Sequence, residues 1–416
     1  MRHKQFSFWV VCALLISDLA LVHAAGTMSE GAEANPSAVT VAPAVTPVAT
    51  PTADGGKILI PDPPVVAGTS FILEDFNSGK VLAEKEADTR VAPASLTKVM
   101  TVYVIFNELS KGHLKLDEMV TISDNAWKTQ GSRMFVDVNK QVSVEDLLQG
   151  VIIQSGNDAS VALAEHVAGD EATFANLMNQ HAARLGMKDT HFTNSMGLPS
   201  PDHYSTARDL AKLTRAVISE FPQYYRWDSQ KEFTYNKITQ PNRNLLLWRD
   251  PSVDGVKTGH TEEAGYCMIA SAKRNDMRLI SVVMGTKSPI ARANESQSLL
   301  NYGFRFYETH RLYTAKQTLS EPKIWKGDID KLPVGFIEDF YVTVPIRHFN
   351  DLKAEITVDP KIMAPITEGT VMGKVVFTLG GAPYFEKPLV ALKTVNTGSI
   401  FQRLYDQILM MVMRHG

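Results

Sequence analysis

The chain has 416 residues, 44% of them hydrophobic and 21% charged, and a formal net charge of −3. This length and composition indicate a globular protein of two or three domains with a large buried core. The slightly acidic balance argues against the basic surface that nucleic-acid binding requires, so we expect no nucleic-acid partner.

The first 25 residues have the composition of a secretory signal peptide. Arg2 and Lys4 give a positive start, residues 6–21 are mostly apolar, and residues 22–25 offer small side chains for cleavage. A membrane-spanning helix is the alternative, but the apolar run is short for one and contains Asp18. We therefore predict removal of residues 1–25 and export of the remainder.

Cysteine usage constrains the exported chain. Cys12 lies in the predicted signal peptide, so Cys267 is the cysteine that remains, and it cannot form an internal disulfide. The apolar neighbours of Cys267 predict a packed strand residue rather than a reactive thiol. Stability should then come from core burial.

Residues 26–64 are rich in Pro, Ala, Thr and Val and cannot bury enough apolar surface to fold. We predict a partly extended linker there. After it, residues 70–75 have the pattern of a strand, Asn77-Ser78-Gly79 that of a turn, and residues 80–84 that of a returning strand.

The segment Ser95-Leu96-Thr97-Lys98 begins the next predicted element, a helix over Leu96–Leu109. Positions i and i+3 share one face of a helix, so the amine of Lys98 would lie within reach of the Ser95 hydroxyl. A serine hydroxyl is a weak nucleophile until a neighbouring base takes its proton. The alternative for an isolated pair of this kind is a serine that only caps the helix.

Helical stretches continue to about Leu210, among them Val144–Ile153 and Ser160–Val167. A second polar motif, Ser155-Gly156-Asn157, directly follows an apolar run. Its structural interpretation is a turn that ends a helix, and its functional interpretation is a polar wall of the site that contains Ser95.

From Val253 the pattern changes to strands. The motif Lys257-Thr258-Gly259 precedes predicted strands at Tyr266–Ala272 and Arg278–Met284, and Asn294–Thr309 is predicted to be helical. Because strands at both ends enclose a helical middle, we predict an α+β fold with one antiparallel sheet packed between helices.

Residues 315–394 contain short strand-like runs separated by Gly and Pro, which predicts a small all-β domain without a catalytic constellation. The predicted strands are Phe340–Val344, Ala354–Val358, Val371–Leu379 and Leu389–Leu392.

Residues 395–416 have the apolar spacing of a two-faced helix. Its apolar positions are Ile400, Phe401, Leu404, Tyr405, Ile408, Leu409, Met411 and Val412. Polar residues interrupt it too often for it to span a bilayer. One interpretation is a helix that lies in a membrane surface, and the other is a helix docked on the β domain or in a dimer interface.

The three motifs Ser-x-x-Lys, Ser-x-Asn and Lys-Thr-Gly occur in the order found in penicillin-binding proteins and class A β-lactamases. On these motifs the chain resembles the D-alanyl-D-alanine carboxypeptidases, the low-molecular-mass penicillin-binding proteins of bacteria. Further stretches that carry the resemblance are Asn77–Glu84, Pro93–Lys98, Tyr204–Asp209 and Leu279–Gly285. Together they cover about residues 66–394, and the linker lies outside the match.

The resemblance implies a penicillin-binding catalytic domain over residues 65–314, a β-rich domain over 315–394 and a membrane-anchoring helix over 395–416. It also implies an exported enzyme, peripheral to the periplasmic face of the inner membrane. The implied reaction removes the terminal D-alanine from peptidoglycan stem pentapeptides, and β-lactam antibiotics are implied ligands.

For this chemistry we expect Ser95 to be the nucleophile and Lys98 its base, kept neutral by burial and by the nearby cation Lys257. Ser155 would relay protons between the two lysines and the leaving nitrogen. Asn157 would hold both Lys98 and the substrate amide.

The oxyanion hole should use the backbone N–H groups of Ser95 and His260. Lys257, Thr258 and Gly259 should bind the substrate, with Arg292 as a second anchor for its carboxylate. The structural interpretation of Arg292 is a surface salt bridge to Glu295.

Three other functions fit parts of the pattern. A class A β-lactamase needs a glutamate on the loop at 197–203, which offers only Asp202. A D,D-endopeptidase or transpeptidase would use the same scaffold. A wall-binding protein without activity has no need of all the motif residues. The scattered histidines His181, His191 and His203 lack ligand spacing, so we expect no metal and no cofactor.

Overall fold

A computed structural model describes residues 58–413 of the chain. The predicted signal peptide lies outside the described residues, as do most of the predicted linker and residues 414–416.

The catalytic part contains a five-stranded sheet in the order β2-β1-β9-β8-β7, with every neighbouring pair antiparallel. The strands are β1 (Ser70–Asp75), β2 (Val81–Lys85), β7 (Val253–Thr261), β8 (Gly265–Arg274) and β9 (Met277–Thr286). The first strand has the predicted bounds, and the second is shifted by one residue. The third motif lies on β7, which is an edge strand.

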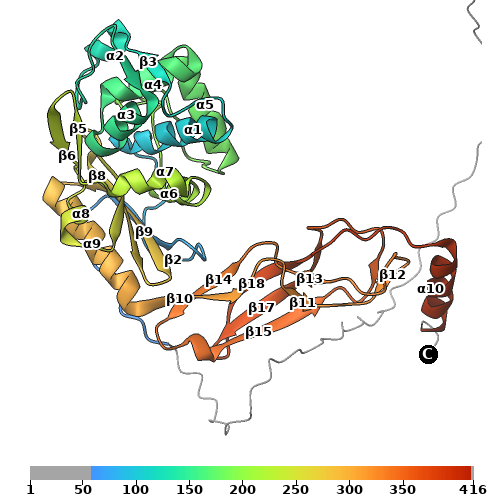
Figure 1. Cartoon of the computed structure of the whole chain (residues 1–416). Coiled ribbons are helices and arrows are strands. Elements are labelled where there is room, and N and C mark those ends of the chain that lie inside the picture. The colour runs from blue at the N-terminus through green and yellow to red at the C-terminus, as the bar shows by residue number, and fades with distance from the viewer. Residues whose placement is uncertain (1–57, 414–416) are drawn as a thin grey trace, which may run out of the picture. The chain divides into compact units, whose positions relative to one another are not determined.

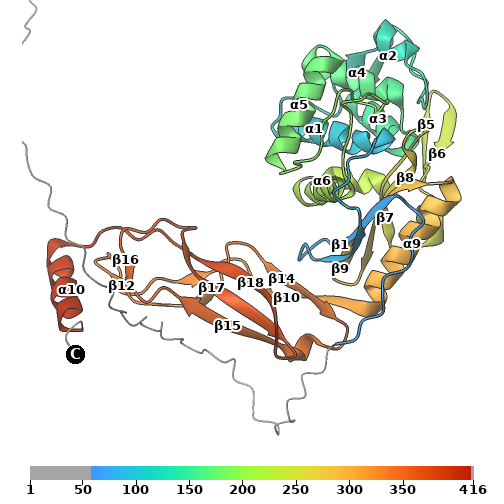
Figure 2. The same cartoon turned by 180° about the vertical axis from the view of Figure 1, so that it is seen from behind.

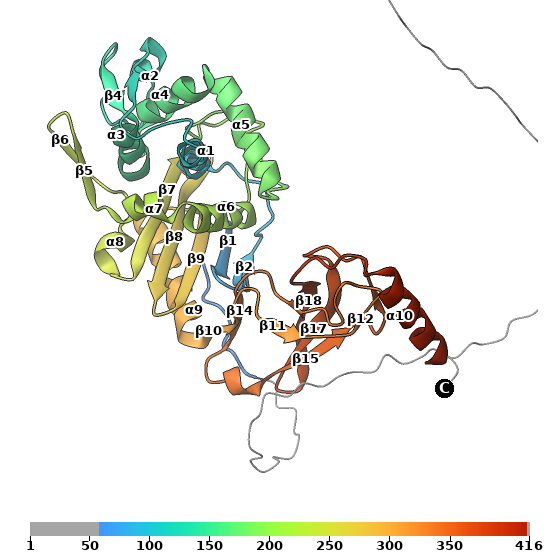
Figure 3. The same cartoon turned by 45° about the vertical axis from the view of Figure 1, so that its right-hand side comes forward.

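Successive side chains of the sheet enter two different cores, because strand side chains alternate between faces. On β9, Ile280 and Val282 pack in the core that contains the helical region, whereas Leu279 and Val283 pack on the opposite face. Helix α6 (Ala207–Glu220) covers the first face and α9 (Pro289–Phe306) the second (Figure 3). The predicted antiparallel sheet between helices is confirmed.

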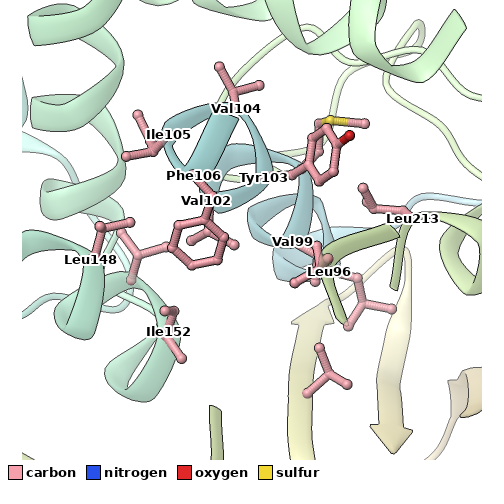
Figure 4. Packing of buried hydrophobic residues seen from close by; sticks show 14 of the residues in the cluster. Leu96, Val99, Val102, Tyr103, Val104, Ile105, Phe106, Leu148, Ile152 and Leu213 are labelled. Carbon is pink, nitrogen blue, oxygen red and sulfur yellow. The ribbon is translucent and has the colours of Figure 1, made fainter. Parts of the chain in front are cut away.

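The helical region surrounds α1 (Lys98–Ser110), which follows the 3₁₀ turn η1 (Ala94–Thr97). Side chains from all around α1 are buried, including Val99, Tyr103 and Phe106 (Figure 4). Leu148 and Leu213 pack in the same cluster from other helices. This packing fixes the position of the residues at the start of α1.

Figure 1 also shows the other helices and strands of this part. They are β3 (Met119–Thr121), α2 (Asp124–Lys128), β4 (Gln141–Ser143), α3 (Val144–Gln149), η2 (Gly150–Gln154), α4 (Asn157–Ala168), α5 (Glu171–Arg184), α7 (Pro222–Tyr225), η3 (Arg226–Ser229), β5 (Glu232–Tyr235), β6 (Ile238–Pro241) and α8 (Leu246–Arg249). The short pairs β3–β4 and β5–β6 were not predicted, because three or four residues carry little periodic signal.

The predicted helix over Asn294–Thr309 is wrong at its last three residues. Helix α9 ends at Phe306, and Tyr307 begins strand β10 (Tyr307–Tyr313). Residues 307–309 pair with Pro345, Val344 and Thr343 of β14 (Phe340–Pro345). This long-range pairing overrides the local pattern.

The C-terminal part is a small β domain, as predicted (Figure 2). Its five-stranded sheet has the order β11-β13-β18-β17-β15. Its further elements are β11 (Thr318–Ser320), β12 (Ile324–Trp325), β13 (Val334–Gly335), η4 (Phe349–Asp351), β15 (Leu352–Val358), β16 (Ile362–Met363), β17 (Val371–Leu379) and β18 (Ala382–Ala391).

The chain then forms helix α10 (Ile400–Val412), which starts with a capping box between Ser399 and Gln402. Its buried residue is Asp406, whereas Phe401 is 85% and Leu404 59% exposed. Over residues 58–413 the structure contains no helix of the length and hydrophobicity needed to cross a membrane.

Candidate active site

Ser95 and Lys98 meet at the junction of η1 and α1, as their spacing predicts. The Nζ atom of Lys98 lies 3.0 Å from the Ser95 Oγ atom. Ser95 caps no helix, since the residues that precede η1 and α1 are Pro93 and Thr97 and neither cap uses a side-chain hydrogen bond. The capping interpretation of the motif is therefore wrong.

Lys98 is enclosed by protein, with none of its surface exposed. Its Nζ atom donates to Asn157 Oδ1 at 2.7 Å and to the Met196 carbonyl at 2.8 Å. Burial lowers the pKa of Lys98 to about 7, and the charge of Arg243 adds to this effect. A neutral amine has two N–H donors, and these two acceptors use both, so its lone pair is directed to the Ser95 hydroxyl.

The Met196 carbonyl belongs to a tight loop that follows the helical region. The Asn194 carboxamide oxygen accepts the backbone N–H groups of Met196, Gly197 and Leu198 at 3.2, 2.7 and 3.0 Å. Gly197 has a φ of +87°, and a Cβ there would lie 1.8 Å from the Ala94 carbonyl oxygen. Only glycine allows this loop to approach so closely the turn η1, which carries the candidate nucleophile Ser95 and is called the nucleophile turn below.

The second motif forms another wall of the site. Ser155 has a left-handed backbone, with a φ of +66°, and its buried Oγ has no hydrogen-bond partner in the described part of the chain. Asn157 begins α4, and its Nδ2 donates to the Gln130 carbonyl at 2.6 Å. The structure thus connects Asn157 to Lys98, as expected, and places Ser155 nearby without a hydrogen bond to either lysine.

The third motif brings β7 against the nucleophile turn. A Cβ on Gly259 would lie 3.2 Å from the Ser95 backbone nitrogen, so a side chain there would crowd the turn. Arg292 of α9 donates from Nη1 to the Gly259 carbonyl at 2.9 Å. The His260 ring stacks on Tyr266, with ring centroids 3.9 Å apart. Arg292 makes no salt bridge with Glu295 among the ion pairs of residues 58–413.

These walls enclose a cleft of about 740 Å³. The residues that line it are Ser95, Gly131, Ser132, Ser155, Asn157, Met196, Gly197, Leu198, Arg243, Thr258, Gly259, His260, Thr261, Tyr266, Pro289 and Arg292. Seven of the nine predicted site residues are in this set. Lys98 and Lys257 instead lie behind the wall, where they line a small internal cavity.

The site is strongly cationic. Burial lowers the pKa of Lys257 well below its usual range, and the charges of Lys98, Arg243 and Arg292 lower it further. Burial also lowers the pKa of Arg292 to about 10. Such a cluster favours an anionic ligand in the cleft.

Arg243 was missed by the sequence analysis. Arg243 lines the cleft, and its two neighbours in the sequence, Asn242 and Asn244, are both buried. Asn244 Nδ2 donates to the Gly255 carbonyl at 2.9 Å and so ties this loop to β7. The available signal was the polar run Asn242-Arg243-Asn244 between strand and helix patterns, which is typical of an ordinary loop.

His203 is a buried histidine that contacts the turn η1. Its Nδ1 atom accepts the Thr193 N–H at 3.0 Å, and its Nε2 atom lies 2.8 Å from Thr97 Oγ1. Burial lowers the pKa of His203 to about 4, so the ring is neutral and supports the nucleophile turn from behind. In the described region, no group of His, Cys, Asp and Glu side chains is arranged to hold a metal ion.

Comparison with protein families gives two matches that divide the chain. The model of the D-alanyl-D-alanine carboxypeptidases (peptidase S11) matches residues 58–288, and the model of the C-terminal domain of penicillin-binding protein 5 matches residues 307–397.

Individual proteins match over most of their length. The chain is 46% identical to D-alanyl-D-alanine carboxypeptidase DacC of Escherichia coli over 355 residues, which are 83% of this chain and 89% of that protein. It is 44% identical to DacA of the same organism over 364 residues, or 85% and 90% of the two chains. The crystal structure of penicillin-binding protein 5 from Haemophilus influenzae superimposes with a TM-score of 0.78 at 42% identity, covering 80% of this chain and 99% of that one.

Proposed function

The chain belongs to the D-alanyl-D-alanine carboxypeptidase family, and on that premise we propose that it removes the terminal D-alanine of peptidoglycan stem pentapeptides through an acyl-enzyme on Ser95. The contact between Lys98 Nζ and Ser95 Oγ carries the assignment, since a buried amine with a pKa of about 7 is a competent base at neutral pH.

The reaction proceeds in two steps. Lys98 takes the Ser95 proton while the oxygen attacks the carbonyl carbon of the penultimate residue, and the adjacent C–N bond breaks as the departing D-alanine nitrogen gains a proton. Water then hydrolyses the ester and restores Ser95. The Ser95 and His260 backbone N–H groups are the proposed donors to the oxyanion in both steps.

Three features of the cleft suit a peptide that ends in a carboxylate. Arg243 and Arg292 line it, and a guanidinium fork matches a carboxylate well. Thr258 adds a hydroxyl. As the edge strand of its sheet, β7 has one side free for backbone hydrogen bonds to an extended substrate. Lys257 acts from behind this wall.

Acylation by β-lactams is part of the same proposal. A structural relative, penicillin-binding protein D2 of Listeria monocytogenes, is known in an ampicillin-bound form and superimposes with a TM-score of 0.54 at 30% identity. A β-lactam would acylate Ser95 in the same way as the stem peptide.

The decisive experiment compares Ser95→Ala with the wild type. We expect the variant to lose both D-alanine release from a pentapeptide and covalent labelling by fluorescent penicillin. Ser110→Ala, at the other end of α1, is the matched control and should retain both. Persistence of either activity in Ser95→Ala would disprove the acyl-enzyme scheme.

Product analysis separates the alternative activities. Mass spectrometry of digested peptidoglycan should show loss of single D-alanine residues rather than cleaved or newly formed cross-links. Slow rather than rapid penicillin turnover should distinguish the enzyme from a β-lactamase, because the loop at 197–203 has no glutamate to activate water.

We further propose that the protein is exported by residues 1–25 and attaches peripherally to the outer face of the inner membrane through α10. In support, large apolar side chains of α10 are exposed, among them Ile400, Phe401 and Ile408. We retain the proposed division into a catalytic domain (65–314), a β domain (315–394) and an anchor (395–416).

Vesicle sedimentation tests the anchor. The double change Phe401→Glu and Ile408→Glu should release the protein from lipid vesicles, since each buried apolar side chain contributes about 1.5–3 kcal/mol. Arg403→Gln, a polar change on the same helix, is the control and should still sediment. Equal sedimentation of all three proteins would exclude attachment through this face.

A further inference from the structure

Asp228 is a buried carboxylate in η3, behind the strand that carries the third motif. It is 6% exposed. A Cβ on Gly255 would lie 3.1 Å from the Asp228 Cβ and 2.6 Å from the Tyr225 hydroxyl, so η3 and β7 are in direct contact two residues before Lys257. The position of Asp228 relative to β7 is therefore fixed by packing.

Asp228, Lys257 and Lys98 line one small cavity of about 10 Å³. All other lining residues are apolar: Val99, Val102, Val151, Ile152, Val217 and Val256. Because the surroundings are apolar, charges here interact more strongly than on a surface.

The charged groups around Lys257 come from four elements. Lys98 faces it from α1, Arg243 from the loop before α8, Arg292 from α9 and Asp228 from η3. The first three are cations, which oppose a proton on Lys257, and Asp228 favours it. Asp228 is thus the counter-charge to a cationic cluster.

A second carboxylate nearby, Asp254, is already engaged. It lies 2.7 Å from Nη2 of Arg278 and accepts from the Tyr225 hydroxyl at 2.9 Å. Its charge raises the pKa of Asp228, in addition to the larger effect of burial. The charge of Lys257 lowers the pKa of Asp228 against these two effects, so an ionised Asp228 and a protonated Lys257 favour each other.

We propose that Asp228 is a positioning residue that keeps the proton on Lys257, so that the third motif presents a cation to the substrate carboxylate. The inference rests on the proposed function and adds a residue to it that touches neither substrate nor Ser95. Lys257 is effective only while protonated, so activity should fall at high pH once it loses that proton.

The test is the pH profile of kcat/KM for a pentapeptide with Asp228→Asn, which keeps the shape of the side chain and removes its charge. The pKa of Lys257 should fall, so the alkaline limb should move to lower pH, with about tenfold more activity lost at about pH 9 than at pH 7. The acid limb, which reports Lys98, should not move to lower pH, because a less protonated Lys257 opposes the proton on Lys98 less.

Asp254→Asn is the matched control. It removes a neighbouring carboxylate that is not among the charges acting on Lys257, so its alkaline limb should not move to lower pH. If Asp228→Asn folds poorly, Asp228→Leu removes the charge and the polar atoms together and should shift the limb in the same direction.

An alkaline limb that superimposes on that of the wild type in both Asp228 variants would overturn the inference. So would an equal shift in Asp254→Asn, because the effect would then be structural. Failure of the proposed function is distinguishable, since it would appear as an active Ser95→Ala variant whatever the Asp228 profiles show.

Discussion

At the scale of single residues, the chemistry depends on a lysine that has to be neutral in a cationic cluster. Burial is the largest cause of the lowered pKa of Lys98, and Arg243 is the neighbouring charge that contributes to it. We expected Lys257 in that role, but the pKa of Lys257 is itself lowered by Lys98. The two amines thus disfavour each other's protons, and surrounding charges determine which one keeps its proton.

The first prediction concerns the acid limb of the reaction. Since the pKa of Lys98 is about 7 and only the neutral amine can accept the Ser95 proton, acylation should slow as the pH falls below that value. The expected slope is about tenfold per pH unit. Stopped-flow labelling with penicillin from about pH 5 to pH 8 measures it, and a flat rate over this range would contradict the role of Lys98.

The second prediction concerns Arg243→Gln. Loss of this charge should raise the pKa of Lys98 and move the acid limb to higher pH. Loss of a carboxylate partner should also raise KM for the pentapeptide about tenfold, or about 1.4 kcal/mol. Arg249→Gln, on the exposed end of α8, is the control and should change neither value. A raised KM with an unmoved acid limb would refute the electrostatic part.

At the scale of elements, close approaches of the backbone hold three segments of the site in contact. The loop at 194–198 supplies the carbonyl that binds Lys98, η1 supplies the nucleophile and β7 supplies the opposite wall. Asp158 adds a further attachment, because its carboxylate accepts the N–H groups of residues 134–136, in the loop beside Ser132. Small backbone shifts should therefore affect catalysis.

The third prediction compares two glycines with positive φ. Gly197→Ala should abolish acylation and cost about 3 kcal/mol or more, because the new methyl would collide with the Ala94 carbonyl. Gly186→Ala has a similar φ of +68° but open space, so it should cost about 1 kcal/mol and keep acylation. Thermal unfolding and penicillin labelling measure both effects, and equal losses would show that clash with the nucleophile turn is unimportant.

Local patterns explain which elements were predictable. Residues 71–73 form a continuous apolar run, which is typical of a strand buried on both faces, and they do enter two cores in turn. The Ser95–Lys98 contact depends only on helical spacing. By contrast, Thr309 pairs with Thr343, and a partner 34 residues away leaves no local signal.

The parts of the site that could not be predicted also leave no local signal in the sequence. The Met196 carbonyl is a backbone acceptor, which any residue could supply, so its role is invisible in the sequence. Asp228 and Arg243 act on the lysines through space, from segments with ordinary loop and turn patterns. The motif residues were predictable because their chemistry resides in the side chain.

At the scale of the whole molecule, α10 has an inverted distribution of polarity. Its buried residue is a carboxylate, Asp406, whereas most of its large apolar side chains are exposed. Asp406 accepts the backbone N–H of Lys326, and Lys323 lies 3.8 Å from the same carboxylate. These contacts tie the helix to the β domain by its polar face and leave the other face for a second surface.

The fourth prediction separates these two faces. Asp406→Ala should weaken the attachment of α10 to the β domain by about 1–3 kcal/mol, since it removes a hydrogen bond to a charged group. Amide exchange at Lys326 should become faster, whereas vesicle binding and penicillin labelling should be retained. Unchanged exchange at this amide would mean that the contact contributes nothing to docking.

The burial of the two motif lysines has a further consequence for the chemical stability of the protein. Lys98 is 0% and Lys257 5% exposed. A neutral amine, such as that of Lys98, would otherwise react readily with acylating agents, aldehydes and reducing sugars. Such reagents should modify the solvent-exposed lysines first. Chemical modification should therefore accumulate on the surface lysines, while the amines of Lys98 and Lys257 stay unmodified.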